Sequence, residues 1–227
     1  MAEITRIQAL ARILNLQNIS KGIVDITDER LSNLDYLQNV LEQEIECRSD
    51  VKEVKVRKQS KLPKKKFDHV KTNKGLVWHI EKLKMLEFIE DNQNIIVLGA
   101  CGTGKTSLAC MIGEEAIKAK LKVYYTTLDS FLEILSEKET SSKKRTQFQY
   151  MKECDLIILD DVFYTELSKE KMYLLYRNII FLSETRSIIC ISNREISEWP
   201  CVTDDKHLMT TFRDRITLGS QILRLGY

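Results

Sequence analysis

Glycine and proline are scarce in this chain, and long apolar runs are missing altogether. Of its 227 residues, eight are glycine and two are proline, while 43% are hydrophobic, which is enough for a packed core. No apolar run approaches the roughly 18 residues that a membrane-spanning helix needs. The first residues, MAEITRIQALAR, lack the continuous apolar core of a signal peptide. We therefore expect a soluble, cytoplasmic protein without a membrane partner, built as one sizeable domain with a small appendage.

The spacing typical of metal sites and of paired redox cysteines is also absent. The six cysteines form no C-x-x-C pair, and the three histidines stand alone in the sequence. This disfavours a zinc site and a disulfide framework. We expect most of the cysteines to be small core residues in a reducing compartment.

The few glycines are concentrated at one place, because three of them lie between residues 99 and 104, directly after the apolar run Ile95–Leu98. They complete a G-x-x-x-x-G-K-[ST] phosphate loop, in which glycine lets the backbone turn sharply and point its N–H groups at phosphate oxygens. Lys105 is expected to reach the β- and γ-phosphates, and Thr106 to place its hydroxyl on Mg²⁺. The predicted nucleotide-binding residues are Gly99, Ala100, Cys101, Gly102, Thr103, Gly104, Lys105, Thr106 and Ser107.

A second apolar run is followed by two carboxylates. A phosphate loop needs such a carboxylate site for the metal ion and the attacking water. Leu156–Leu159 reads as a buried strand and is followed by Asp160 and Asp161. We expect Asp160 to bind Mg²⁺ through water, as in a Walker B motif, and Asp161 to orient or deprotonate the attacking water. A strand that merely ends in a polar turn is the simpler alternative.

Two further sites carry candidate residues for hydrolysis. Asn193 follows the apolar run Ser187–Ile191, where an amide can sit between the γ-phosphate and the lytic water. Arg213 and Arg215 lie in a helical segment near the end of the chain. Because residues two apart on a helix point to different sides, at most one of them is expected to reach a neighbour's γ-phosphate as an arginine finger. Surface arginines paired with nearby acids are an equally good interpretation of that spacing.

The order of elements predicts an α/β domain of three layers around a parallel sheet, preceded by a small N-terminal helical region. Apolar β-branched runs without polar alternation are linked through helical patterns, which is typical of a parallel sheet covered on both faces. Its ligand is expected at the carboxyl ends of the strands. The predicted strands are Ile95–Leu98, Val123–Thr126, Leu156–Leu159, Ser187–Ile191 and Ile222–Leu225. The predicted helices of this domain are Lys105–Lys120, Leu128–Lys138, Lys169–Glu184 and Asp205–Ile216.

Before this domain, apolar spacing predicts one helix through Ile4 and Leu14, a second from about Thr27 to beyond Ile45, and a third from Leu76 to Leu86. A basic linker is expected between the second and third helices. Residues 52–66 hold eight basic residues and one acid, a charge of +7 that leaves −5 for the rest of a chain whose net charge is +2. Such a block is a candidate contact for a phosphate backbone or, equally, a solvated linker. Residues 140–145 read as an exposed loop.

Taken together, these motifs resemble the AAA+ ATPases, and within them the IstB family of transposition helper ATPases, relatives of the DnaC/DnaI helicase loaders. The phosphate loop, the Ser192-Asn193 pair followed by Glu198-Trp199, and Phe212–Ile216 with its Asp-Arg pair carry the resemblance. Leu31–Arg48 resembles the short N-terminal helical region of the family, and Phe67-Asp68 resembles the lead-in to its ATPase core, so the similarity runs from about Leu31 to Gly226. The sequence departs from the family in having Asp161 where many members have glutamate, and Ser107 where many have histidine.

The resemblance implies an ATP- and Mg²⁺-dependent oligomer that binds double-stranded DNA, partners a transposase and steers its choice of insertion site. It favours Arg215 as the finger acting between subunits. Family members commonly end in a segment with a second sensing arginine, for which Arg224 is the nearby candidate here. The expected division is residues 1–66 for the helical region and basic linker, and residues 67–227 for the AAA+ ATPase domain.

Two other functions compete with this interpretation. A replicative helicase loader has the same motifs, with a helicase as its principal partner. A small-molecule kinase also uses a phosphate loop, but the sequence offers no evident acceptor-binding lid. GTPase chemistry is disfavoured because no [NT]-K-x-D base-recognition motif is present.

Overall fold

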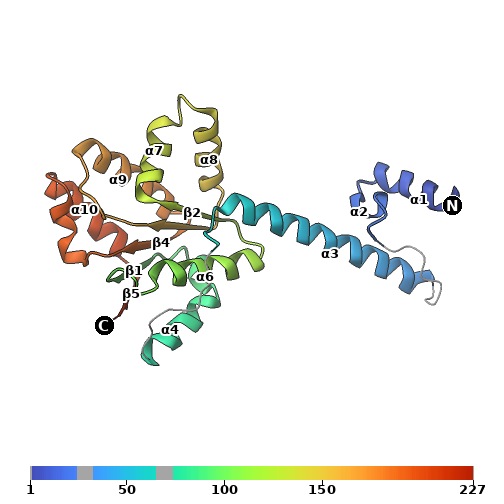
Figure 1. The fold of residues 1–227 in the computed structure, drawn as a ribbon, viewed down its shortest axis with the longest axis horizontal. Helices are drawn as coiled ribbons and strands as arrows, with labels where there is room; N and C mark the ends of the chain where they lie inside the picture. Colours follow the sequence, from blue (N-terminus) through green and yellow to red (C-terminus); the bar gives the residue numbers. More distant parts are fainter. Residues whose placement is uncertain (1, 25–32, 65–73, 227) are drawn as a thin grey trace. The chain divides into compact units, whose positions relative to one another are not determined.

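The structure, a computed structural model, describes residues 2–24, 33–64 and 74–226. The chain forms two compact units, residues 1–55 and 56–227, each described here by itself (Figure 1). Their boundary falls within the long helix α3 (Asn33–Ser60). The boundary expected from the sequence, between residues 66 and 67, lies outside the described residues.

The larger unit is built on a five-stranded parallel sheet, as predicted. The strand order is β2-β3-β4-β1-β5, so β4 lies at the centre, between β3 and β1. Every residue of β1, β3 and β4 is buried, which explains why these strands read as unbroken apolar runs. The strands are β1 (Ile95–Gly99), β2 (Val123–Thr127), β3 (Leu156–Asp160), β4 (Ser187–Ser192) and β5 (Gln221–Leu225).

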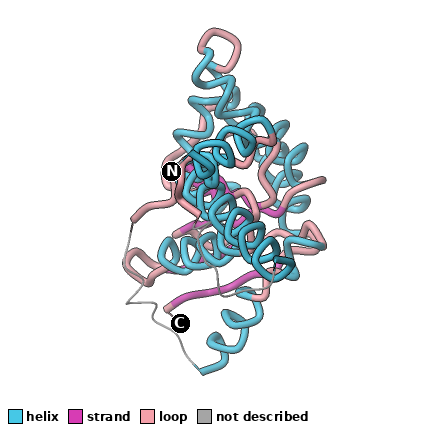
Figure 2. Tube along the Cα trace, turned by 90° about the vertical axis from the view of Figure 1, so that its right-hand side faces the viewer, coloured by secondary structure: helices cyan, strands magenta, loops and turns pink. Residues whose placement is uncertain are grey.

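Helices cover both faces of the sheet, which completes the three layers (Figure 2). Successive residues of β1 point to opposite faces: Ile95 and Val97 pack beneath one set of helices, Ile96 and Leu98 beneath the other. The first face carries α4 (Lys74–Lys84), α5 (Glu87–Glu90) and α6 (Lys105–Lys118). The second carries α7 (Leu128–Glu137), α8 (Ser142–Lys152), α9 (Lys169–Ser183), the 3₁₀ helix η1 (Ile196–Val202) and α10 (Lys206–Thr217).

The expectation of an exposed loop over residues 140–145 is wrong, because α8 begins at Ser142. Ser141 caps this helix, its hydroxyl accepting from the backbone N–H of Lys144. The Lys144 ammonium pairs with Glu133 of α7 at 2.8 Å. Lysine and arginine are good helix formers, so a charged run that reads as solvated can continue a helix once its first turn is capped.

The expectation of a basic linker over residues 52–66 is also wrong for its first part, because residues 52–60 belong to the helix α3. The Ser60 hydroxyl donates to the carbonyl of Arg57 and accepts from the backbone N–H of Leu62, which fixes the end of the helix there. Val56 is buried in the core under α4 and α6, with Leu62 packed against it. This packing holds the last turn of α3 and residues 61 and 62 on the larger unit.

The smaller unit contains α1 (Ala2–Ile13), α2 (Gln17–Ser20) and the first part of α3. Glu44, the one buried acid among the described residues of this unit, accepts hydrogen bonds from the backbone N–H groups of Asn18 and Ile19 at the start of α2. Arg48, one turn along α3, pairs with the same carboxylate. The start expected for the second helix, near Thr27, lies outside the described residues. Among the described segments, no helix is long and apolar enough to cross a membrane.

Candidate functional site

The phosphate loop connects β1 to α6 at the carboxyl edge of the sheet. Gly99, Gly102 and Gly104 have φ angles of +149°, +78° and +92°, a region of backbone space that suits glycine. The Lys105 ammonium donates to the carbonyl oxygens of Gly99 and Ala100 at 2.7 and 2.8 Å. The Lys105 side chain thus folds back onto the phosphate loop. Phosphate oxygens of a bound nucleotide would compete with these two carbonyl oxygens for its ammonium group.

Lys105 also lies near the two predicted carboxylates. Partial burial lowers the pKa of the Lys105 ammonium, and the acidic groups of Cys101, Asp160 and Asp161 act in the opposite direction. A phosphate anion would add a further negative charge beside this partly desolvated ammonium. The structure therefore brings the lysine of the loop and the acids that follow β3 into one electrostatic environment.

Asp160 is the centre of the hydrogen bonding at this site and is only 4% exposed. Its Oδ2 atom accepts from the Thr106 hydroxyl at 2.8 Å and from the Tyr125 hydroxyl, also at 2.8 Å. Its Oδ1 atom accepts from the backbone N–H of Asp161 at 2.8 Å. A carboxylate beside a threonine hydroxyl offers the oxygen ligands that Mg²⁺ prefers, so the residues present fit this metal.

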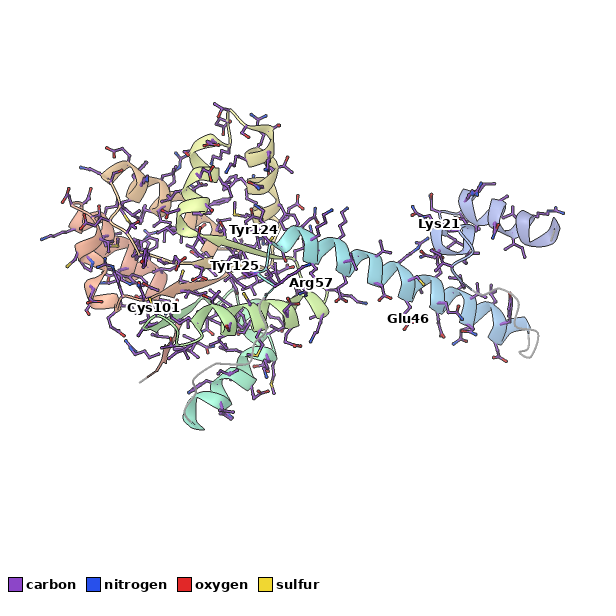
Figure 3. The ribbon with its side chains drawn as sticks, viewed as in Figure 1. Lys21, Glu46, Arg57, Cys101, Tyr124 and Tyr125 are labelled. Carbon is purple, nitrogen blue, oxygen red and sulfur yellow. The ribbon has the colours of Figure 1, made fainter. Side chains whose placement is uncertain are left out.

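Tyr125 is a member of the site that the sequence did not reveal. It lies on β2, beside β3, and neighbours Tyr124 (Figure 3). Burial, and then the negative charge of Asp160, raise the pKa of the Tyr125 hydroxyl far above its usual value. The hydroxyl is therefore a proton donor at any physiological pH. No motif in the sequence links a tyrosine on β2 to the acids after β3.

The segment after Asp160 is held in an unusual conformation. Asp161 and Phe163 both have positive φ angles, +54° and +61°. The backbone N–H of Val162 donates to the carbonyl of Ile191, and the Ser192 hydroxyl donates to the carbonyl of Val162 at 2.7 Å. The end of β4 thus fixes the turn that carries Asp161, and the strain of that turn is compensated by these hydrogen bonds.

Asn193 follows Ser192 directly and is exposed at the carboxyl end of β4. Because β4 lies between β3 and β1, this residue lies at the edge of the sheet that also carries the phosphate loop and Asp160. The structure therefore brings the polar ends of three strands to one edge, which is the arrangement expected from the sequence.

A buried aromatic cluster packs against the turn that carries Asp161. The Phe163 ring packs edge-on against Trp199 of η1 and Phe212 of α10, with centroid distances of 5.0 and 5.8 Å. The Arg194 guanidinium donates to the Phe163 carbonyl at 2.8 Å. The tryptophan of the Ser-Asn…Trp segment is thus a core residue behind the site, and sequence reasoning missed this role of Arg194.

The three candidate arginines differ in what they contact. Arg213 pairs with Asp214 next to it at 2.8 Å. Arg215 is exposed and makes no ion pair within the described part of the chain. Arg224, on the edge strand β5, pairs with Glu195 at 3.2 Å. Arg215 is accordingly the arginine of α10 that is available to another molecule.

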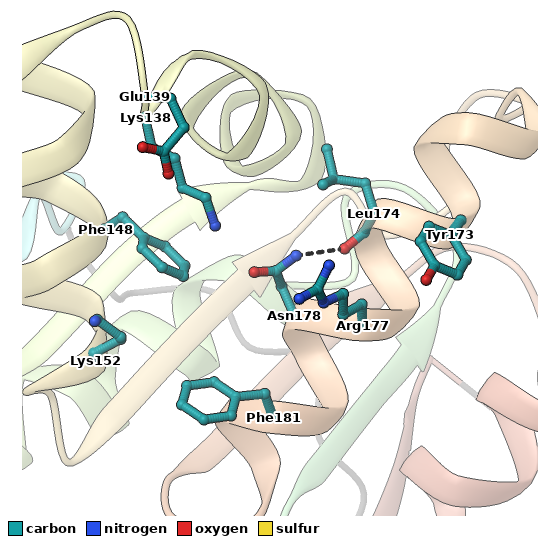
Figure 4. Close-up of a pocket in the computed structure, with 9 residues that line it drawn as sticks. All are labelled: Lys138, Glu139, Phe148, Lys152, Tyr173, Leu174, Arg177, Asn178 and Phe181. Atoms are coloured by element: carbon teal, nitrogen blue, oxygen red, sulfur yellow. Dashed lines mark hydrogen bonds between the residues drawn. The ribbon is translucent and has the colours of Figure 1, made fainter.

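Outside this site, a cavity of about 640 Å³ lies between the α7–α8 pair and α9 (Figure 4). Its cations make no ion pair within 4 Å among the described residues, and Lys138 lies over the Phe148 ring at 4.0 Å from its centroid. Burial lowers the pKa of Lys138, and the charges of Arg177 and Lys152 lower it further, against the opposing effect of Glu139. The lining residues are Lys138, Glu139, Phe148, Lys152, Tyr173, Leu174, Arg177, Asn178 and Phe181.

Comparison with known proteins places most of the chain in one family. Residues 6–226 match the family model described as IstB-like ATP binding protein. An insertion sequence IS21-like putative ATP-binding protein of Bacteroides fragilis is 27% identical over 224 residues, covering 95% of this chain and 85% of that protein. The insertion sequence IS5376 putative ATP-binding protein of Geobacillus stearothermophilus is 31% identical over 202 residues, covering 86% and 79%.

Solved structures share the fold of the larger unit. A DnaC helicase loader superposes with a TM-score of 0.57 at 17% identity, over 74% of this chain and 97% of that one. DnaA from Aquifex aeolicus bound to AMPPCP superposes with a TM-score of 0.55 at 25% identity. That match covers 72% of this chain, which spans half the length of the DnaA chain. The fold is thus that of the AAA+ ATPases.

Proposed function

The chain belongs to the IstB-like ATP-binding protein family, and on this premise we propose that it is a Mg²⁺-dependent ATPase that assists a transposase. In this proposal it binds double-stranded DNA, forms a homo-oligomer with ATP, and promotes target-site selection and strand transfer for an insertion sequence. The observation that carries the ATPase assignment is the hydrogen bond between Thr106 of the phosphate loop and Asp160 at the end of β3. It joins the two halves of a metal–nucleotide site.

Within this site, each group has a physical role. The loop amides of residues 99–107 and the Lys105 ammonium bind the phosphates, while Thr106 and Asp160 hold Mg²⁺, which supplies charge neutralisation at the β- and γ-phosphates. Asp161 orients the attacking water, and Asn193 lies at the neighbouring strand end to contact the γ-phosphate or that water. Arg215, exposed on α10, stabilises transition-state charge in the site of an adjacent subunit.

The transposase partnership rests on the relatives, because several of them carry the name of an insertion sequence. The helicase-loader alternative is supported by the shared fold of DnaC, at 17% identity. The family match over residues 6–226 favours the transposition role. Capture of a replicative hexameric helicase, and failure to capture a transposase, would reverse this preference.

Positive charge on the larger unit supports DNA binding. The Lys61 ammonium lies over the Tyr124 ring, 5.1 Å from its centroid. Burial lowers the pKa of Lys61, and the positive charges of Lys144 and Lys143 lower it further, against the opposing effect of Glu133. Lys61, just after α3, and the cations at the start of α8 therefore lie close together, with Glu133 paired to one of them, Lys144. The remaining positive charge favours a polyanion at this surface.

The cavity between the α7–α8 pair and α9 is a second place where basic side chains gather on the larger unit. It combines Lys138, Lys152 and Arg177, which make no ion pair within the described residues, with one acid, Glu139, and the exposed aromatic rings of Tyr173 and Phe181 (Figure 4). Cationic side chains gathered at one surface are the groups with which proteins contact the phosphate backbone of duplex DNA. Lys152, near the end of α8, lies on the cavity side, so α8 connects the two basic surfaces.

The test is ATP turnover and particle size of the purified protein, with and without duplex DNA, at two salt concentrations. We expect DNA to stimulate hydrolysis, ATP to drive assembly, and added salt to weaken the DNA effect, since counterion release drives phosphate contacts. Lys105→Ala is the matched control, because it removes the phosphate-binding charge and should abolish the response. A wild-type protein that stays a DNA-indifferent monomer would contradict the proposed role.

A further inference from the structure

The Asp160 carboxylate is held by donors from three different elements. Thr106 comes from the first turn of α6, Tyr125 from β2, and the Asp161 amide from the turn after β3. The two hydroxyls share one oxygen, Oδ2, and the amide binds the other. A carboxylate that is 4% exposed depends on such donors, because burial without hydrogen bonds disfavours its charged form.

The two hydroxyls differ in what a bound metal would do to them. The Thr106 hydroxyl is the group that a phosphate loop presents to Mg²⁺, so metal binding takes an oxygen lone pair of that hydroxyl and changes its contact with Asp160. Tyr125 has no such role, because it lies on β2, which is three positions away from the phosphate-loop strand β1 in the sheet order. Its hydrogen bond is therefore the side-chain contact that can hold Asp160 throughout the cycle.

We propose that Tyr125 is a positioning residue for the metal site, and that its hydroxyl holds the Asp160 carboxylate in the orientation from which it meets the Mg²⁺ that accompanies the nucleotide. The proposal rests on the proposed ATPase function and adds a residue to it. Tyr125 acts through Asp160 and touches neither nucleotide nor the reacting atoms. Loss of the Tyr125 hydroxyl lowers the affinity of the site for Mg²⁺ and leaves the phosphate-binding loop intact.

The neighbouring tyrosine provides a matched control on the same strand. Tyr124 points to the opposite face of the sheet, where it is buried in the core beneath α7, α8 and α9, while Tyr125 packs on the α6 face. The Tyr124 hydroxyl has no hydrogen-bond partner among the described residues. Tyr124→Phe and Tyr125→Phe therefore remove the same atom from adjacent residues, and only one of them changes the surroundings of Asp160.

The experiment is a Mg²⁺ titration of the full chain with a fluorescent ATP analogue. In Tyr125→Phe we expect the Mg²⁺ concentration at half-saturation to rise about tenfold, the scale of one lost hydrogen bond to a charged group. Binding of the analogue in EDTA should match the wild type, and saturating Mg²⁺ should restore ATP turnover. Tyr124→Phe should follow the wild-type titration, and thermal unfolding of each variant reports on folding separately.

Different results overturn different conclusions. A Tyr125→Phe titration that superposes on the wild type overturns the positioning role alone. Equal shifts in both tyrosine variants also overturn it, because they indicate a general effect of core packing. A wild-type protein whose nucleotide binding ignores Mg²⁺ overturns the inference together with the proposed ATPase function.

Discussion

A methyl group added at Gly99 would collide with the last strand of the sheet. An alanine Cβ at this position would lie 2.4 Å from the carbonyl oxygen of Leu225, and 3.0 Å from the Thr103 hydroxyl. The clash with Leu225 involves backbone on β5, which is paired with β1 along its length. Neither strand can move without loosening the sheet beneath the phosphate loop.

The magnitude follows from two contributions. A residue other than glycine at φ +149° costs about 1–3 kcal/mol in backbone strain. Overpacking against a fixed neighbour costs about 1–3 kcal/mol more. Gly99→Ala should therefore lower the free energy of unfolding by about 4 kcal/mol, a large part of the roughly 5–15 kcal/mol that stabilises a typical domain.

Gly102→Ala is the matched control, because Gly102 also has a positive φ, +78°, but a Cβ there meets nothing within 4 Å. Its cost should be the backbone term alone, about 1–2 kcal/mol. Urea unfolding followed by tryptophan fluorescence measures both, since Trp78 and the buried Trp199 lie in the larger unit. Equal losses in the two variants would refute the reasoning, because they would show that contact with Leu225 has no cost.

Three further substitutions test the roles of single groups. Asp161→Asn should leave Mg²⁺–nucleotide affinity within about twofold and lower turnover at least tenfold, as single-turnover kinetics would show; unchanged turnover would place the catalytic base elsewhere. Arg215→Ala should be inactive alone but recover hydrolysis when mixed with Lys105→Ala, since each subunit then supplies what the other lacks; no recovery at any ratio would exclude a finger acting between subunits. Arg177→Ala should weaken duplex DNA binding and flatten its salt dependence, and Lys118→Ala on α6 should change neither; equal effects would show that only net charge matters.

The sequence predicted the parts of this fold that follow from local chemistry. Unbroken apolar runs predicted β1, β3 and β4, because the interior of a parallel sheet is buried on both faces. The edge strands β2 and β5 were predicted from less apolar runs and are buried only in part. The phosphate loop and the Asp160-Asp161 pair could be located because both follow unbroken apolar runs, and parallel strands place their carboxyl ends at one edge. The hydrogen bond between Thr106 and Asp160 shows that these two segments meet at that edge.

What the sequence did not predict depends on contacts between elements. The α3 helix continues through the basic residues to Ser60 because Val56 is buried in the core of the larger unit and Leu62 packs against that core. The α8 helix forms where a charged loop was expected because Ser141 caps it and Lys144 meets Glu133. In each case the local pattern is ambiguous between helix and loop, and tertiary contacts decide the outcome.

The aromatic cluster connects two residues that the proposed mechanism assigns to different sites. Phe163 lies two residues after Asp161, and its ring packs against Phe212, three residues before Arg215 on α10. Both rings are fully buried, so neither can shift without displacing the other in a close-packed interior. In the proposed oligomer, the position of Asp161 therefore depends on α10, the helix that carries Arg215, and a nucleotide-dependent shift of either would be transmitted through these two rings.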